Sequence, residues 1–197
     1  MAEWFLVAGG PSLTGFDWER LRGKYVIAVN RAFEVLPFAQ VLYWTDWRFF
    51  SWYTKPILAH RARRKITGLR NADREHNYGP HLGQIEVWRI TGPQGIDRAA
   101  GCLRHGNNAG FAAINLSVHL GAHRIYLLGY DMKATNVGPA HWHDGYPIPT
   151  PVRAYANMIG YYPSLVEPLR HMGIEVVNLN PESALECFPK RNIDEVL

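Results

Sequence analysis

The stretch that most constrains the fold is a short apolar run near the start of the chain, Trp4-Phe-Leu-Val-Ala-Gly-Gly-Pro-Ser-Leu13. A short apolar run closed by glycines is typical of a buried strand that ends in a tight turn. Glycine also lets the backbone approach a ligand closely, because no Cβ intervenes. A helix starting just after the turn would point free N–H groups at the same place and favour an anion there. We therefore predict a strand–loop–helix in which Gly9, Gly10, Pro11 and Ser12 hold a nucleotide phosphate. The alternative is an ordinary strand and turn.

The rest of the chain alternates short apolar runs with helical patterns, which predicts parallel strands joined by crossovers. Strands are expected at 25–29, 41–45, 85–90, 124–128 and 175–179, and helices at 16–22, 47–60, 111–120 and 151–171. A break is expected near Pro163, a kink at Pro56, and a terminal turn with a short helix from 180 onward. The predicted fold is α/β and Rossmann-like, a mostly parallel sheet flanked by helices. We expect one domain over 1–197, with flap or loop insertions near 61–84 and 131–150.

Polar residues follow several of the predicted strands at the point where each strand ends. They are Ser12, Asn30 with Arg31, Asp46 and Asp131. In open α/β sheets, ligands bind at the carboxyl ends of the strands, so these side chains are expected to share one rim. A second candidate anion or base site is the helix start at Gly106-Asn107-Asn108.

The predicted 131–150 loop contains His141-Trp-His143-Asp144-Gly-Tyr146. On an extended segment, residues two apart face the same side, so both imidazoles can converge on one point. One hypothesis is a general base for an acceptor hydroxyl, with Asp144 orienting the ring. A second is a metal site made by His141, His143 and Asp131 or Asp144. The third is a polar surface loop with incidental histidines.

Two carboxylates, Asp46 and Asp131, are candidates for holding magnesium on phosphate oxygens. The equally weighted alternative is that they cap nearby helices or loops. Arg31, Arg48 and the basic run at 61–65 are candidates for neutralising phosphates, against the simpler interpretation of solvated surface arginines.

Composition narrows the class of protein. Apolar residues make up 47% and charged residues 19%, which is a globular composition. The net charge is +4, yet no nucleic-acid-binding motif accompanies it, so nucleic acid is a minor hypothesis. Two cysteines make neither a disulfide framework nor a CxxC metal site. With no signal peptide and no long apolar span, we expect a cytoplasmic protein without a membrane span. A homo-oligomer stays open.

The order of motifs resembles two related groups of proteins. One is the bacterial lipooligosaccharide sialyltransferases; the other is the domain shared by motility accessory factors and archaeal 6-hydroxymethylpterin pyrophosphokinases. Small phage proteins are similar in layout, and the resemblance spans nearly the whole chain. The matching segments are Gly9–Leu13, Asn30-Arg31, the strand closing on Asp46, Gly106–Gly110, Ile125–Asp131, Asn178–Leu185 and Phe188-Pro189.

This resemblance implies a Rossmann-like domain that binds a nucleotide across the strand ends. In the sialyltransferases the donor is a cytidine-monophosphate sugar. By that analogy Gly10, Pro11 and Ser12 approach the phosphate or ribose, and Asn30 bonds to one of them. The Gly106–Gly110 loop holds the base or ribose, with Asn107 and Asn108 where those enzymes have a Ser-Gly turn. Tyr146 and either His141 or His143 occupy the region of their catalytic loop.

The first hypothesis for function is glycosyl transfer from a nucleotide sugar with a histidine base; the acceptor is not defined by the sequence. The second is magnesium-dependent pyrophosphoryl transfer from ATP to a hydroxymethyl acceptor. The third is a protein that binds or sequesters a nucleotide without turnover. Only the second requires a cofactor, Mg²⁺.

Overall fold

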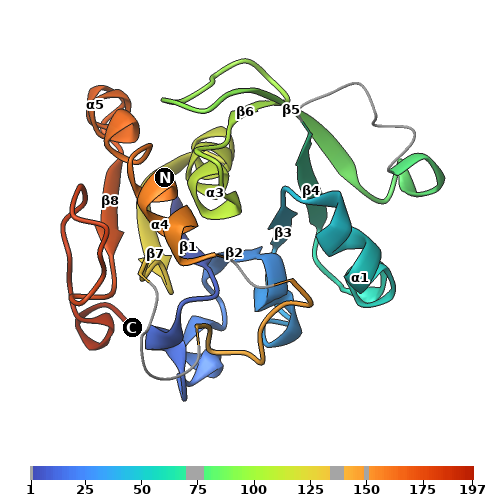
Figure 1. Cartoon of the computed structure of the whole chain (residues 1–197), viewed down its shortest axis with the longest axis horizontal. Helices are drawn as coiled ribbons and strands as arrows, with labels where there is room; N and C mark the ends of the chain where they lie inside the picture. The colour runs from blue at the N-terminus through green and yellow to red at the C-terminus, as the bar shows by residue number, and fades with distance from the viewer. Residues whose placement is uncertain (1, 70–77, 134–139, 149–150) are drawn as a thin grey trace.

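The protein is built on one sheet of eight parallel strands (Figure 1). The computed structural model describes residues 2–69, 78–133, 140–148 and 151–197. Neighbouring strands run in the order β6-β5-β4-β3-β2-β1-β7-β8, so the predicted α/β fold with a mostly parallel sheet is confirmed. The strands are β1 (Ala2–Val7), β2 (Tyr25–Val29), β3 (Val41–Trp44), β4 (Arg64–Leu69), β5 (Glu86–Gly92), β6 (Cys102–Arg104), β7 (Ala122–Leu128) and β8 (Glu175–Asn178).

Helices and single turns of 3₁₀ helix connect these strands. The α-helices are α1 (Trp47–Ala59), α3 (Ala109–His119), α4 (Val152–Ile159) and α5 (Pro163–His171). The 3₁₀ helices are η1 (Pro11–Leu13), η2 (Trp18–Leu21), η3 (Asn30–Glu34), η4 (Gly79–His81) and η5 (Ile193–Glu195). None of the described helices is long and apolar enough to cross a membrane.

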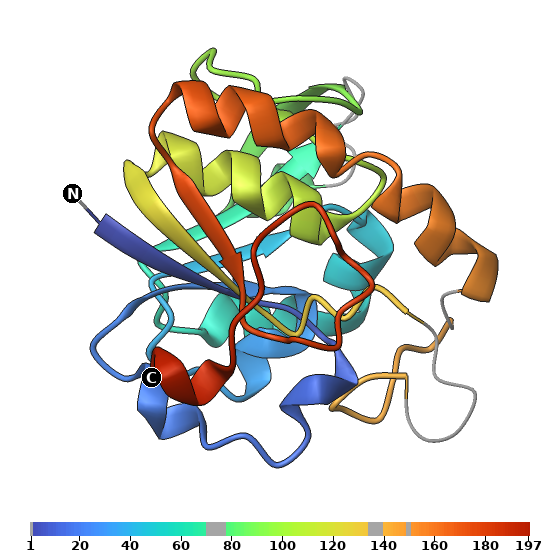
Figure 2. The same cartoon turned by 90° about the vertical axis from the view of Figure 1, so that its left-hand side faces the viewer.

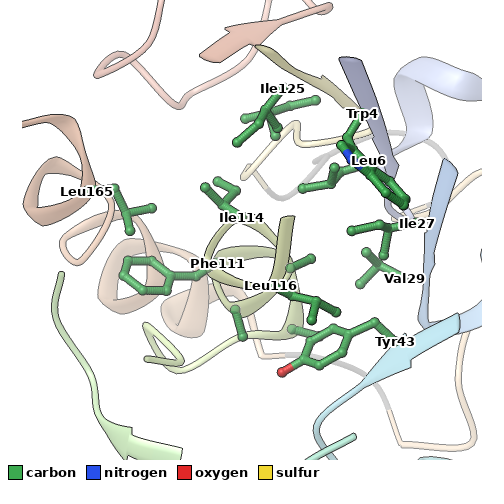
Figure 3. Packing of buried hydrophobic residues seen from close by; sticks show 14 of the residues in the cluster. Trp4, Leu6, Ile27, Val29, Tyr43, Phe111, Ile114, Leu116, Ile125 and Leu165 are labelled. Atoms are coloured by element: carbon green, nitrogen blue, oxygen red, sulfur yellow. The ribbon is translucent and has the colours of Figure 1, made fainter. Parts of the chain in front are cut away.

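The central strands bury side chains on both faces, which explains their nearly continuous apolar sequences. Alternate residues of β1 divide between two cores: Trp4 and Leu6 face one, Phe5 and Val7 the other. Figure 3 shows Leu6 and Ile27 in the first core with Phe111 and Ile114 of α3. Helices α3 and α5 cover this face, while α1, the 3₁₀ helices and the last residues, 193–197, lie on the opposite side (Figure 2).

Several expected elements differ from the structure. Segment 61–84, expected as loop or flap, contains β4; residues 70–77 lie outside the described part. The helix expected at 16–22 is only the 3₁₀ helix η2, which begins after its N-cap Asp17 and ends at Leu21. Strand β6 was not expected. The short terminal helix is η5, later than 180–185. The kink in α1 lies at Tyr53 (φ −119°, ψ 22°), within one turn before Pro56, as the proline predicts.

Candidate functional site

A cavity of about 150 Å³ opens at the carboxyl ends of β1, β2 and β7. Strands β2 to β6 follow one another on one side of β1, whereas β7 and β8 lie on its other side. Such a switch in strand order leaves a crevice where α/β proteins bind ligands. The lining residues come from the strand ends, the start of α3, the 140–146 segment and α4. They are Ala8–Pro11, Val29, Asn30, Asn108–Gly110, Gly129–Lys133, Ala140, His141, Tyr146, Tyr155, Met158 and Tyr162.

The turn after β1 is tied to the end of β7. Gly10 N–H donates to Gly129 O (2.9 Å), and Ser12 donates from its backbone N (3.1 Å) and Oγ (2.8 Å) to Asp131. A Cβ on Gly10 would lie 1.8 Å from Asp131 Oδ2, so the glycine is required by this internal contact. The turn continues into the short η1, so the α-helix expected here is absent.

A helix start suited to an anion lies instead at α3. Asn108 is its N-cap, with Oδ1 accepting from Phe111 N–H (2.8 Å) and from the Tyr162 hydroxyl (3.0 Å). The next two residues, Ala109 and Gly110, line the cavity, and their N–H groups have no partner among the described residues. First-turn N–H groups that lack intrahelical partners attract anions, because the helix dipole adds positive potential there. This end of α3 is therefore the best-placed anion site in the cavity.

His141 stands in the cavity wall with one nitrogen already engaged. Its Nδ1 lies 3.2 Å from Gly9 O, and because a carbonyl only accepts, this nitrogen carries the proton. Nε2 is then the nitrogen with a free lone pair in the neutral ring. Burial lowers the pKa of His141, opposed by the Gly9 carbonyl and reinforced by the charge of Arg31. His141 is thus held as a neutral proton acceptor.

His143 stacks on His141, with ring centroids 4.7 Å apart and an interplanar angle of 12°. Its Nδ1 accepts from Gly145 N–H (3.1 Å), and its Nε2 is buried without a partner in the described structure. Burial, with His141 and Arg31 adding to it, lowers the pKa of His143 to about 4. His143 does not line the cavity, so it supports His141 from behind.

Arg31 fastens the same segment from the outside. Its guanidinium contacts Asp144, donates to Gly145 O (2.5 Å) and pairs with Glu34 (2.7 Å). On the inner side, Trp142 donates from its indole to Ala8 O (2.9 Å) and from its backbone to Gly9 O (3.2 Å). Segment 141–146 is therefore held against the Gly9 turn from two sides.

Two cavity residues other than glycine have left-handed backbone conformations at strand ends. Asn30 follows β2 with φ 52°, and Met132 lies shortly after β7 with φ 53°. Asparagine adopts this conformation readily, but for methionine it is strained and persists only where its surroundings enforce it. The Asn30 side chain hydrogen bonds with the Tyr146 hydroxyl, whose pKa is raised by burial despite this bond.

The structure separates the two candidate magnesium ligands. Asp131 lines the cavity but accepts hydrogen bonds from Ser12 and from Asn180 Nδ2 (2.9 Å), and burial raises its pKa. Asp46 is not among the lining residues: it is the N-cap of α1 and pairs with Arg48 (2.7 Å). In the part of the chain that the structure describes, no three His, Cys, Asp or Glu side chains gather as metal ligands, including the His141–His143–Asp combination.

Eight of the predicted site residues line the cavity: Gly9, Gly10, Pro11, Asn30, Asn108, Asp131, His141 and Tyr146. Ser12, Arg31, His143 and Asp144 lie behind them through the contacts above. Two more lie just outside: Gly106, where a Cβ would lie 2.2 Å from Phe111 Cγ, and Asn107, which donates to Asn157 Oδ1 (2.9 Å). The sequence reasoning missed Tyr130, Lys133, Tyr155, Met158 and Tyr162. Only Tyr130 carried a clue, since it immediately precedes Asp131 at a strand end.

Comparison with known proteins supports the architecture. No family model matches the chain, and no curated protein sequence matches it significantly. Among solved structures it is similar to a MAf glycosyltransferase from Magnetospirillum magneticum AMB-1, with a TM-score of 0.61 and 14% sequence identity. The match covers 100% of this chain and 34% of that one, so the chain spans about a third of that protein's length. At this identity the likeness shows a shared fold.

Proposed function

We propose that the protein is a glycosyltransferase that takes its sugar from a nucleotide donor bound in the cavity at β1, β2 and β7. The observation that carries this proposal is the pairing of a proton acceptor, His141, with the anion-binding start of α3 in one cavity. Glycosyl transfer needs both functions at once. The structural likeness to a protein described as a glycosyltransferase supports the same class.

In the proposed reaction an acceptor hydroxyl attacks the anomeric carbon of the donor sugar. The bond between that carbon and the phosphate oxygen breaks, and the nucleotide leaves with the electron pair. Nε2 of His141 takes the hydroxyl proton. The N–H groups of Ala109 and Gly110 face the charge that grows on the departing phosphate. His143, Asp144 and Arg31 are positioning residues for His141, and Asn30 and Tyr146 complete the wall.

The charges around the cavity favour a donor with few phosphate charges. Within the described part of the chain, Lys133 is the one lysine or arginine among the lining residues, and it donates to Glu182 O. An ATP triphosphate carries several negative charges and is normally met by Mg²⁺ and a cluster of cations. A sugar esterified to a nucleoside monophosphate carries a single one. The pyrophosphokinase hypothesis therefore has less support than the transferase hypothesis.

The test is product analysis with a panel of nucleotide sugars and ATP, each with and without a chelator. We expect release of nucleotide from a nucleotide sugar, unaffected by the chelator. Transfer from ATP that stops in the chelator would favour the pyrophosphokinase instead. Tight nucleotide binding with no product from any donor, even with water as acceptor, would favour a sequestering protein.

His141→Gln tests the proposed base. General-base catalysis contributes about 10²–10⁴-fold, so turnover should fall by at least about 100-fold while donor binding is kept. In the wild type, turnover should drop with falling pH only below 6.5, because the pKa of His141 is lowered from that value. An unchanged rate in His141→Gln would rule out the base assignment but leave donor binding intact.

A further inference from the structure

An open hollow adjoins the candidate cavity at the start of α3. It has a volume of about 500 Å³ and is lined by Asn107, Pro151, Arg153, Ala154, Asn157 and Met158. Met158 also lines the cavity, and Asn107 directly precedes Asn108, the N-cap of α3 that lines the cavity too. The two spaces therefore meet at the helix start that is proposed to face the donor phosphate.

The cavity is too small to hold two substrates. Pockets that enclose one small ligand have volumes of about 300–1,000 Å³. The cavity at β1, β2 and β7 measures about 150 Å³, which leaves no space for an acceptor beside a bound donor. Glycosyl transfer needs both molecules at once, so the acceptor requires a second space that opens into the cavity. The hollow meets this requirement through the shared side chain of Met158.

Helix α4 forms the wall between the two spaces. Tyr155 and Met158 are three residues apart, hence neighbours on the helix surface, and both line the cavity. Arg153 and Asn157 are four residues apart, hence also neighbours, and both line the hollow. Figure 2 shows α4 on the side of the molecule where the strands end. One helix thus turns an aromatic and apolar side to the cavity and a polar side to the hollow.

The polar groups of the hollow suit a hydroxylated ligand with a negative charge. Arg153 is exposed, and within the described residues it has no acidic partner and no acidic side chain beside it in the hollow. Asn107 Nδ2 donates to Asn157 Oδ1 (2.9 Å), which leaves the N–H groups of Asn157 Nδ2 without a partner in the described structure. A guanidinium binds carboxylate or phosphate through paired hydrogen bonds, and an amide binds hydroxyl groups. The other lining residues supply apolar atoms for the C–H face of a sugar ring.

We propose that this hollow binds the acceptor, and that the acceptor is an acidic saccharide whose carboxylate or phosphate pairs with Arg153. The proposal rests on the proposed glycosyl transfer. A saccharide that lies in the hollow and passes over Met158 enters the cavity, where His141 lines the wall. Its charged group stays at Arg153 while one of its hydroxyl groups meets the donor. Arg153 thus selects the acceptor and takes no part in the proton transfer.

The first test measures binding without any reaction, by NMR titration of the full chain with three sugars. Methyl glucuronide and glucose 6-phosphate carry a charge, and methyl glucoside is the neutral match. An exposed ion pair changes affinity by up to about fivefold, so a charged sugar should bind about two- to fivefold more tightly than the glucoside. Whichever charged sugar shows the larger preference identifies carboxylate or phosphate as the group that is recognised.

Matched variants assign the preference to the hollow. Arg153→Gln should abolish it, and Arg153→Lys should keep most of it. Asn157→Asp keeps an acceptor for Asn107 but adds a carboxylate beside Arg153, so it should lower the ratio of charged to neutral affinity. Arg98→Gln removes an exposed arginine that does not line the hollow and should bind all three sugars as the wild type does.

The second test uses the nucleotide sugar that the donor panel identifies, with the same three sugars as acceptors. Arg153→Gln should raise the KM for the charged acceptor about two- to fivefold and leave kcat at saturating acceptor unchanged. A rise in the KM for the donor instead would assign the hollow to the donor and overturn the proposal. So would a wild type without charge preference, or a preference that survives Arg153→Gln. Absence of product from every donor would contradict the transferase, whereas the NMR titration decides separately whether the hollow binds an acidic saccharide.

Discussion

His143 illustrates how one residue can report on the state of the candidate site. Its ring is half-buried between Gly9, His141 and Tyr146, and its buried Nε2 finds no partner in the described structure. Burial disfavours the charged form of the ring, and His141 and Arg31 add to this, so the pKa of His143 is lowered to about 4. The folded protein therefore resists a proton that the unfolded chain accepts near pH 6.5.

This difference predicts a pH-dependent stability. Between pH 6.5 and about 4 the unfolded state binds more protons than the folded state, so stability falls as the pH falls through this window. In His143→Asn the melting temperature should fall less steeply over the same window, as thermal melts at several pH values would record. His119→Asn is the control, since that histidine lies elsewhere, beside Trp88. Parallel pH profiles for wild type and His143→Asn would contradict the account.

Gly10 predicts a second residue-level outcome. Gly10→Ala would place a methyl group 1.8 Å from Asp131 Oδ2 and 2.4 Å from Gly129 O, and both neighbours are held by hydrogen bonds. Overpacking of this kind costs about 1–3 kcal/mol, which lowers the melting temperature of a chain of this size by roughly 2–12 °C. Gly160→Ala has ordinary contacts of 3.6 Å and helical φ, so it should not destabilise. Equal melting temperatures for the two variants would mean that the turn relaxes freely.

At the scale of elements, periodicity predicted the buried strands well because they carry unbroken apolar runs. Strand β4 escaped prediction because its sequence, Arg64-Lys-Ile-Thr-Gly-Leu69, has cations and a glycine that resemble a basic loop. Its arginine pairs with Glu86 on the next strand, a contact visible only after folding. Strand β6 has three residues, too few for any periodicity.

The same distinction applies to the site. Strand ends were sufficient to predict that Asn30 and Asp131 share a rim. Strand ends alone could not show that Asp46 lies outside the cavity. Asp46 pairs with its near neighbour Arg48 and caps helix α1. Nor could strand ends anticipate Tyr155 and Met158, which line the cavity from α4. The proposed anion site lies at α3 and not at the Gly9 turn, because the Gly9 turn leads into a short 3₁₀ helix whereas the start of the α-helix α3 lines the cavity.

Helix α3 therefore carries a prediction of its own. Asn108→Asp keeps an N-cap acceptor for Phe111 and Tyr162, so the melting temperature should hold. The new carboxylate, however, repels a phosphate at the same helix end, so nucleotide affinity should fall by about tenfold or more by calorimetry. Asn108→Ala is the companion variant: it loses the cap, about 0.5–2 kcal/mol, and should melt lower. If Asn108→Asp binds the nucleotide as tightly as the wild type, the phosphate does not bind at the start of α3.

At the scale of the whole molecule, the cavity is lined by segments that are distant in sequence. A ligand bound there therefore stabilises the folded chain as a whole. A nucleotide that binds only the folded state, supplied at 100 times its dissociation constant, contributes about 2.7 kcal/mol. For a chain of this size that corresponds to a rise in melting temperature of about 5–10 °C. The measurement is a thermal-shift screen over nucleotides and nucleotide sugars, with free ribose and inorganic phosphate as controls. Equal shifts with phosphate alone would mean that the base and sugar make no contact.

Strand β1 lies inside the sheet, between β2 and β7, and this position has a consequence during synthesis of the chain. Its turn is joined to β7 through Ser12 and Asp131, which are 119 residues apart. At a ribosomal speed of about 5–20 residues per second, β7 is synthesised roughly 6–24 s after β1. During this interval one side of an apolar strand stays uncovered on the nascent chain. Strand β1 thus gains its second neighbour only late in synthesis, and until then its uncovered edge has to be kept from pairing with other chains.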